Sequence, residues 1–283
     1  MRVLLVPNVV KAEAAAAATE LVSWLSAEGL EPVLVNDDAT AVGLADFGVS
    51  PSDLGQPVLV VALGGDGTIL KAFHLLGERE VPILGVNMGR LGFLTGVGPG
   101  SIRAAVGDAL AGEVGLERRM TLVADVDMAG KHAGTYRALN EICLGRGGGS
   151  NRVIGITVVI NGTELMSFGA DGIVVATPTG STAYALSAGG PIVSPEASGM
   201  LVVPIAAHTL ASRAILTGPS DVIELRIDAE RSTDGCLTVD GDATPCRRSI
   251  TRVTLARSPH DVVLVKSEGR DFYQVVAREF FGG

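Results

Sequence analysis

The sequence predicts two structural parts: an N-terminal α/β domain with a parallel, Rossmann-like sheet, then a β-rich, sandwich-like domain. Up to about residue 111, apolar strand-like runs alternate with helical patterns, which is typical of a parallel sheet covered on both faces. From about residue 115 the chain changes to short runs separated by turn residues. Asn161-Gly162, between two such runs, is a strong hairpin signal.

The elements of the first part follow from its pattern of apolar residues. Strands are expected at 1–8, 30–36, 57–63 and 81–87, and helices at 11–27, 69–76 and 101–111. Gly29 follows the first helix, where a C-terminal cap belongs.

The change of pattern sets the expected domain limits. We expect an α/β domain over 1–114, a β-rich domain over 115–265, and a C-terminal segment over 266–283. The run DFYQVVAREFFGG in that last segment predicts a short helix or strand that returns to the first domain.

Composition excludes several classes of protein. The 283 residues are 47% hydrophobic and 19% charged, which indicates a globular chain. A net charge of −9 without a visible basic patch argues against a nucleic-acid partner. No apolar run is long enough to span a membrane, and the N-terminus reads as a strand and a helix, not as a signal peptide. The histidines lack the spacing of metal ligands, and none of the three cysteines forms a CxxC pair. We therefore expect a cytoplasmic protein without a structural metal site.

Asp66 stands between glycines in the stretch ALGGDGTIL, directly after an apolar strand. Ligands bind at the carboxyl ends of parallel strands, and amides at the start of a helix can hold phosphate oxygens. Gly64, Gly65 and Gly67 would let the backbone turn tightly and approach a ligand. The carboxylate would then accept a proton or help to hold Mg²⁺. The alternative is a simple turn in which Asp66 is a helix N-cap.

A second polar stretch, DGIVVATPTGSTAYALSAGGPIVSP, covers residues 171–195. Its strand ends at Ala176, a turn follows at Thr177-Pro178, and a small-residue helix begins near Gly180. The hydroxyls and the ring of Tyr184 suit a nucleotide, because a ring can stack on a base while hydroxyls bind its polar edges. The alternative is a capped helix with a packed tyrosine.

These motifs carry a family resemblance. GGDGT resembles the signature of a superfamily that contains NAD kinases, diacylglycerol and sphingosine kinases, and 6-phosphofructokinases. TPTGSTAY followed by SAGGPIVSP resembles the hallmark of NAD kinases, Asn140-Glu141 resembles their NE pair, and GVNMGRLGFLT (85–95) resembles their loop after the fourth strand. The likeness runs in order from about residue 57 to 245. The chain is therefore identified as a member of the NAD kinase family, most similar to the actinobacterial type.

The resemblance implies roles for individual residues. Asp66 would contact the 2′-hydroxyl of the adenosine ribose of NAD and accept its proton, and Gly65, Gly67 and Thr68 would lie against phosphates. Phe93 would line the adenine pocket, and Asp171 would hold the nicotinamide end. The remaining NAD contacts would be the NE pair, Asn140 and Glu141, and a group that reaches adenine and ribose across a subunit boundary: Thr179, Thr182, Ala183, Tyr184 and Ser187.

Some candidates and departures stand outside these roles. Arg90, Arg152 and Arg213 could hold donor phosphates, because guanidinium groups bind phosphate well. Gly96 stands where many family members carry an acid, and Asp242 replaces the glutamine of a DGQ run near the expected nucleotide.

The resemblance implies phosphoryl transfer from ATP, or from polyphosphate, to NAD with Mg²⁺, in a homo-oligomer (a dimer or a tetramer) and without nucleic acid or membrane. Three alternatives stay open. One is a 2′-hydroxyl kinase for another nucleoside or nucleotide, which Gly96 and Asp242 favour. The others are a lipid or sugar kinase and a non-catalytic NAD(P)-sensing protein.

Overall fold

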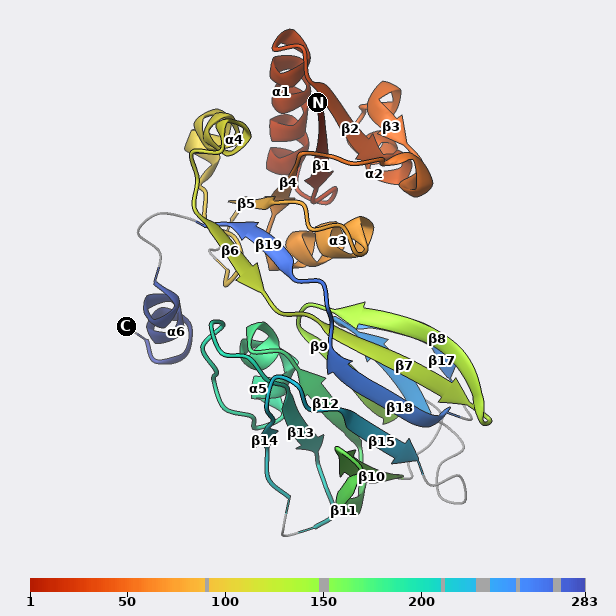
Figure 1. The fold of residues 1–283 in the computed structure, drawn as a ribbon. Coiled ribbons are helices and arrows are strands. Elements are labelled where there is room, and N and C mark those ends of the chain that lie inside the picture. Colours follow the sequence, from red (N-terminus) through yellow and green to blue (C-terminus); the bar gives the residue numbers. More distant parts are fainter. Residues whose placement is uncertain are drawn as a thin grey trace. The chain divides into compact units, whose positions relative to one another are not determined.

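The computed structural model describes residues 1–89, 92–147, 153–209, 212–227, 235–247, 250–266 and 271–282. The chain divides into two compact units, one formed by Met1–Arg118 with Val262–Gly283 and the other by Arg119–Asp261. The first is an α/β unit with a parallel sheet and the second is built from antiparallel strands, which confirms the predicted fold class. Figure 1 labels the elements of both units.

The sheet of the first unit has seven strands in the order β3-β2-β1-β4-β5-β19-β6. The pairs from β3 to β19 are parallel. The strands are β1 (Arg2–Pro7), β2 (Glu31–Val35), β3 (Gly48–Val49), β4 (Leu59–Gly64), β5 (Ile83–Asn87), β6 (Leu116–Arg119) and β19 (Val262–Val265). Since β1 and β4 are neighbours at the centre, the loops after them open at the same edge of the sheet.

Helices cover both faces of this sheet (Figure 1). Alternate strand residues such as Val61 and Leu63 share one core with α1 (Ala12–Ala27) and α4 (Ile102–Ala111), while α3 (Asp66–Leu76) contacts β1, β4 and β5 outside that core. The other helical elements are α2 (Asn36–Ala41), α6 (Phe272–Phe280) and short 3-10 turns at Ala45–Phe47, Pro51–Asp53 and Pro99–Ser101.

Helix α3 begins at Asp66, although the sequence predicted a glycine loop until Ile69. Glycine has a low helix propensity, so the prediction excluded GGDG from the helix. The first turn is closed locally instead: the Thr68 amide donates to the Gly65 carbonyl at 2.9 Å, and the Gly65 amide donates to Thr68 Oγ1 at 3.3 Å.

The chain returns to the first unit earlier than residue 266. Strand β19 pairs with β5 through Leu264 and Ile83. Its run VVLV is a short apolar strand that fits either sheet, so the sequence pattern extends the β-rich part to residue 265. Its segment continues into α6, which is a helix of the first unit.

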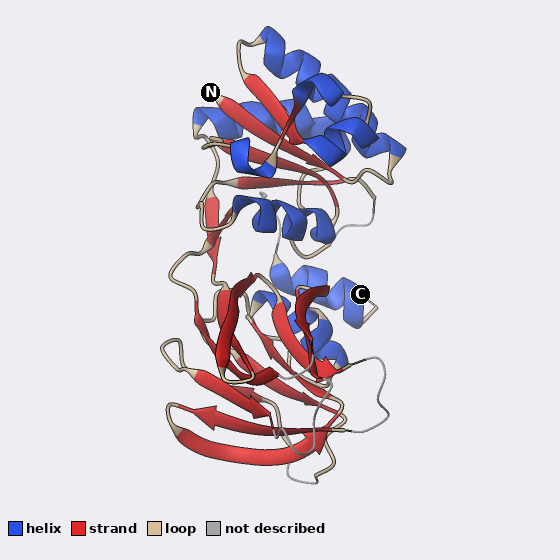
Figure 2. Cartoon of the chain, turned by 90° about the vertical axis from the view of Figure 1, so that its right-hand side faces the viewer, coloured by secondary structure: helices blue, strands red, loops and turns tan. Residues whose placement is uncertain are grey.

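The second unit is a sandwich of two antiparallel six-stranded sheets, shown in red in the lower part of Figure 2. One has the order β11-β10-β15-β18-β7-β8 and the other β14-β13-β12-β9-β16-β17, and residues of both sheets form one apolar core. The first sheet contains β7 (Leu122–Met128), β8 (Lys131–Ala138), β10 (Ile154–Ile160), β11 (Thr163–Ala170), β15 (Ile223–Ile227) and β18 (Ile250–Arg257). The second contains β9 (Glu141–Arg146), β12 (Gly172–Ala176), β13 (Leu201–Ile205), β14 (Ile215–Leu216), β16 (Gly235–Val239) and β17 (Asp242–Arg247).

The predicted hairpin joins β10 to β11. Asn161 and Gly162 both have positive φ, at 51° and 81°, which is the backbone that a two-residue hairpin turn requires. On the other sheet, the outward residues Cys143, Val174 and Ala176 are covered by Ala185 of the short helix α5 (Tyr184–Ser187).

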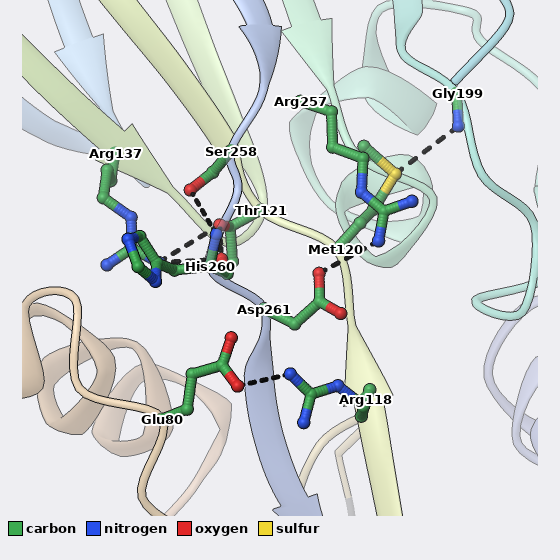
Figure 3. A network of polar contacts seen from close by, with 10 residues as sticks. All are labelled: Glu80, Arg118, Met120, Thr121, Arg137, Gly199, Arg257, Ser258, His260 and Asp261. Atoms are coloured by element: carbon green, nitrogen blue, oxygen red, sulfur yellow. Dashed lines mark hydrogen bonds and ion pairs between the residues drawn. The ribbon is translucent and has the colours of Figure 1, made fainter. Parts of the chain in front are cut away.

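The chain passes between the units twice, at residues 118–119 and 261–262. Residues beside these two crossings make polar contacts within their own unit (Figure 3). In the first unit, Arg118 pairs with Glu80. In the second, the His260 carbonyl accepts from Thr121 Oγ1 at 2.6 Å and from Arg137 Nη2 at 3.0 Å. Within the described residues, no helix is long and apolar enough to cross a membrane.

Candidate active site

The carboxylate of Asp66 is surrounded by backbone amides. It leaves the first turn of α3 and accepts hydrogen bonds from the amides of Phe93 (2.6 Å to Oδ2), Leu94 (2.9 Å to Oδ1) and Thr95 (3.3 Å to Oδ1). Gly92 lies so close that a Cβ there would come within 2.3 Å of Oδ1. An ionised carboxylate has about four acceptor positions, so Oδ2, with a single amide donor among these bonds, has room for one more.

The three glycines around Asp66 differ in their surroundings. None of them has a positive φ, so the tight turn does not depend on them. Gly64 is required for packing, because a Cβ there would lie 2.0 Å from Thr68 Oγ1. A Cβ at Gly65 or Gly67 would meet nothing within 4 Å, and both residues face open space.

That open space is a cavity of about 280 Å³ at the ends of β1 and β4. It is lined by Pro7, Asn8, Val9, Lys11, Gly65, Gly67, Thr68 and Lys71. Pockets for drug-sized ligands usually measure about 300–1,000 Å³, so this cavity suits the phosphate part of a nucleotide better than a whole nucleotide. Its lining combines two ammonium groups with the first amides of a helix, which is a suitable environment for phosphate oxygens.

The two lysines are fixed by partners outside the cavity. Lys11 Nζ donates to the Met88 carbonyl at 2.8 Å, and Lys71 Nζ lies 2.5 Å from Oδ1 of the buried Asp38. Sequence reasoning missed both lysines. Lys71 could have been found from its spacing, because it follows Gly67 by four residues and therefore shares its helix face.

Phe93 packs against the C-terminal helix. Its ring centroid lies 6.0 Å from that of Phe272 and 5.8 Å from that of Phe280, both in α6. In the first unit, therefore, the expected adenine-pocket residue already has aromatic neighbours.

In the second unit, the turn at Asn140-Glu141 is held by an aspartate that sequence reasoning left without a role. The Asp240 carboxylate accepts from the amides of Leu139 (3.0 Å), Asn140 (2.7 Å) and Glu141 (3.1 Å). Its position in the Asp240-Gly241 turn of the β16–β17 hairpin was the available signal.

The motif TPTGSTAY packs against the same turn. The Thr177 amide donates to the Asn140 carbonyl at 2.8 Å, and Thr177 Oγ1 donates to the Leu139 carbonyl at 2.6 Å. Gly180 must be a glycine, because a Cβ would lie 2.1 Å from the Asn140 carbonyl oxygen. The structure thus brings the NE pair and this motif together.

Glu141 is a buried carboxyl group that can accept a further hydrogen bond. Its side chain is 6% exposed, and Oε2 has no hydrogen bond within the described part of the chain. Burial raises its pKa to about 7, the charge of Asp240 adds to this rise, and a backbone hydrogen bond from Tyr184 opposes it.

The other predicted contacts of this unit lie around Tyr184. Burial raises the pKa of its hydroxyl, with further contributions from Cys143, Asp171 and Glu141, so the hydroxyl lies in the field of both carboxylates.

The other predicted residues have partners within this unit. Asp171 Oδ1 lies 3.4 Å from Arg146 Nε. Thr179 is buried and accepts from Arg119 at 3.3 Å, and Thr182 Oγ1 donates to the Thr179 carbonyl at 3.4 Å.

The remaining candidates lie beside α5, lie elsewhere on the surface, or fall outside the described residues. Ala183 directly precedes α5, Ser187 ends it on the exposed side, and Asp242 is exposed at the start of β17. Arg213 is exposed, and its Nη1 donates to the Ser212 carbonyl. Arg90 and Arg152 lie outside the described residues.

The described residues contain no group of three or more His, Cys, Asp or Glu side chains that could hold a metal ion. Mg²⁺ is commonly bound through substrate phosphates, water and one or two carboxylates, so the cavity beside Asp66 is compatible with it.

Both parts of the chain match a known protein family. Residues 3–114 match the family model of the ATP-NAD kinase N-terminal domain, and residues 139–267 match that of the ATP-NAD kinase C-terminal domain. The NAD kinase of Citrifermentans bemidjiense is 36% identical over 93% of this chain and 92% of its own length. That of Caldanaerobacter subterraneus is 40% identical over 85% of this chain and 84% of its own length.

Solved structures show the same likeness. Yeast NADH kinase complexed with NADH has a TM-score of 0.89 and 25% identity, covering 100% of this chain and 87% of the yeast chain. An NAD kinase from Archaeoglobus fulgidus in complex with ATP has a TM-score of 0.73 and 26% identity, covering 100% of this chain and 98% of the archaeal one. The chain belongs to the NAD kinase family.

Proposed function

We propose that this protein transfers the terminal phosphoryl group of ATP to the 2′-hydroxyl of the adenosine ribose of NAD and so makes NADP. The observation that carries the proposal is the position of Asp66 between Gly65 and Gly67, two residues at the start of α3 that line a cavity together with Lys11 and Lys71. Polyphosphate is the alternative donor, because the cavity offers its charges to phosphate groups.

In the proposed reaction, the 2′-oxygen bonds to the terminal phosphorus while the bond from that phosphorus to the bridging oxygen breaks. ADP leaves, and the hydroxyl proton passes to Oδ2 of Asp66, the oxygen with one amide donor. Gly65, Gly67, Thr68 and the two lysines hold the donor phosphates. When bound to those phosphates, Mg²⁺ would offset their negative charge. Positioning of the hydroxyl in line with the phosphorus supplies most of the rate.

The second unit supplies the contacts for NAD in this proposal. Oε2 of Glu141 accepts a hydrogen bond from a ribose hydroxyl. The Asn140 side chain binds NAD from the same turn, whose backbone Asp240 holds. Asp171 holds the nicotinamide end. Adenine and ribose contact the predicted group: Thr179, Thr182, Ala183, Tyr184 and Ser187. In the first unit, Phe93 is the proposed adenine contact. Asp242 lies near the nucleotide in this proposal.

We further propose that the protein is a homo-oligomer and that this group serves a neighbouring subunit. Tyr184 supports this, because its side chain is 45% exposed although it is a large aromatic residue. We also propose that the protein is cytoplasmic and that it is similar to the actinobacterial type. The subtype rests on sequence resemblance alone, since the relatives named above come from Citrifermentans and Caldanaerobacter.

Asp66→Asn tests the role of the carboxylate. Loss of the proton acceptor is expected to lower turnover by about 10²–10⁴-fold, with a much smaller change in the dissociation constant for NAD. NADP formation is measured with an NADP-specific dehydrogenase, and NAD binding by calorimetry. Asp108→Asn, at an exposed carboxylate on α4 of the same unit, is the matched control and should be active. Near-normal turnover in Asp66→Asn excludes the proposed role.

Gly67→Ala tests the cavity as the donor site. The added methyl group meets no protein atom within 4 Å and lies in a helix, so stability should be kept or rise by about 0.5–1 kcal/mol. The methyl group narrows the cavity, and KM for ATP should therefore rise while KM for NAD changes little. Gly107→Ala, in helix α4 and also in open space, is the control for the helical effect. An unchanged KM for ATP places the donor elsewhere.

NAD binding should release protons from Glu141. In the free protein the pKa of Glu141 is about 7, and a ribose hydroxyl that donates to Oε2 would favour the ionised form and lower that pKa. Affinity for NAD should therefore rise as the pH is raised through 7, with release of up to about half a proton at pH 7. Calorimetry in buffers of different ionisation enthalpy measures this release. Glu141→Gln should abolish it, and the exposed Glu196→Gln should leave it unchanged. Equal release in both variants refutes the contact.

A further inference from the structure

We infer that the C-terminal helix α6 positions the proton acceptor of the reaction, by holding the loop at 92–95 through the ring of Phe93. The inference rests on the proposed function of Asp66. It adds a second requirement to that function: Asp66 is oriented by a segment that follows it by about 200 residues in the chain.

The first step is that the loop at 92–95 binds Asp66 through hydrogen bonds. Three consecutive amides donate to its two oxygens, and the bond from the Phe93 amide to Oδ2 is the shortest at 2.6 Å. Hydrogen bonds to an ionised acceptor are stronger than neutral ones. A displacement of the loop therefore moves or releases the oxygen that is proposed to take the proton.

The second step is that α6 packs against the loop through aromatic rings. Phe93 supplies both the amide that binds Oδ2 and a ring that contacts two rings of α6. The centroid distances of 6.0 Å to Phe272 and 5.8 Å to Phe280 fall within the range of favourable aromatic pairs, about 4.5–7 Å. Phe272 and Phe280 are eight residues apart, so they lie on one side of the helix, two turns apart.

The third step is that α6 has buried residues besides these rings. Val275 and Val276 are 4% and 7% exposed, and the Asp271 side chain caps the helix by accepting from the Tyr273 amide at 2.7 Å. Removal of one ring keeps both valines, the cap and the other ring, so the helix itself should stay folded. The removal should loosen the loop, because the contact of that ring with Phe93 is lost.

A comparison of neighbouring phenylalanines separates this role from a general effect on stability. Phe280→Ala removes the contact with Phe93, whereas Phe281→Ala removes a ring that is 76% exposed at the next position. Phe280→Tyr keeps a ring and serves as the rescue variant. Each full-length variant is assayed for kcat and KM with ATP and NAD, for thermal unfolding, and for hydrogen exchange in a peptide that contains residues 93–95.

For Phe280→Ala we expect kcat to fall by about 10–100-fold, since a displacement of about 1 Å can cost 10²-fold. KM for ATP should stay within about twofold, because the cavity residues are kept. KM for NAD should rise, because Phe93 is the proposed adenine contact, and exchange at 93–95 should become faster. Phe281→Ala and Phe280→Tyr should match the wild type in kcat and in exchange. If Phe280→Ala does not fold, Phe272→Leu takes its place with the same expectations.

Unchanged exchange at 93–95 in Phe280→Ala, or an equal loss of kcat in Phe281→Ala, overturns the inference. The two proposals fail in different ways. A wild type that makes no NADP refutes the proposed function, whereas the exchange measurement still shows whether α6 holds the loop.

Discussion

The organisation of the first unit depends on the binding of one carboxylate by three amides of a distant loop. Asp66 and the amides of 93–95 come from the ends of neighbouring strands, β4 and β5, and the sheet places those ends together. The bonds satisfy backbone donors at a close approach that only glycine permits at position 92. They also fix the start of α3, and with it the amides and the glycine faces that line the cavity.

The second unit uses the same arrangement for another purpose. Asp240 accepts from three consecutive amides at 139–141 and so fixes the turn that carries Asn140 and Glu141. The charge of Asp240 then lies near Glu141 and adds to the effect of burial on its pKa. A residue that shapes the backbone thereby also tunes the chemistry of its neighbour. An aspartate suits both sites because its short side chain accepts several hydrogen bonds with little conformational freedom.

The charge of the whole chain says little about its ligand. The protein carries a net charge of −9, yet the cavity beside Asp66 presents two lysines and the amides of a helix N-terminus. Local groups dominate at short range, because salt screens the more distant surface charges. The partners of these lysines, the Met88 carbonyl and Asp38, limit the freedom of their ammonium groups before a ligand arrives.

Features that depend on short-range pattern could be predicted from the amino-acid sequence. Apolar runs and helical spacing predicted β1, β2, β4, β5, α1 and α4, and Asn161-Gly162 predicted the β10–β11 hairpin, because these signals concern neighbouring residues. Long motifs sufficed for the family. The folded chain alone shows which distant residues meet: Asp66 with the amides of 93–95, Asp240 with the turn at 139–141, and Phe93 with α6. Each of these contacts joins residues far apart in the chain, and the pairing of strands and packing of helices brings them together. No local propensity encodes those distances, which is why the role of Gly64, the start of α3 and the place of β19 also became clear only in the folded chain.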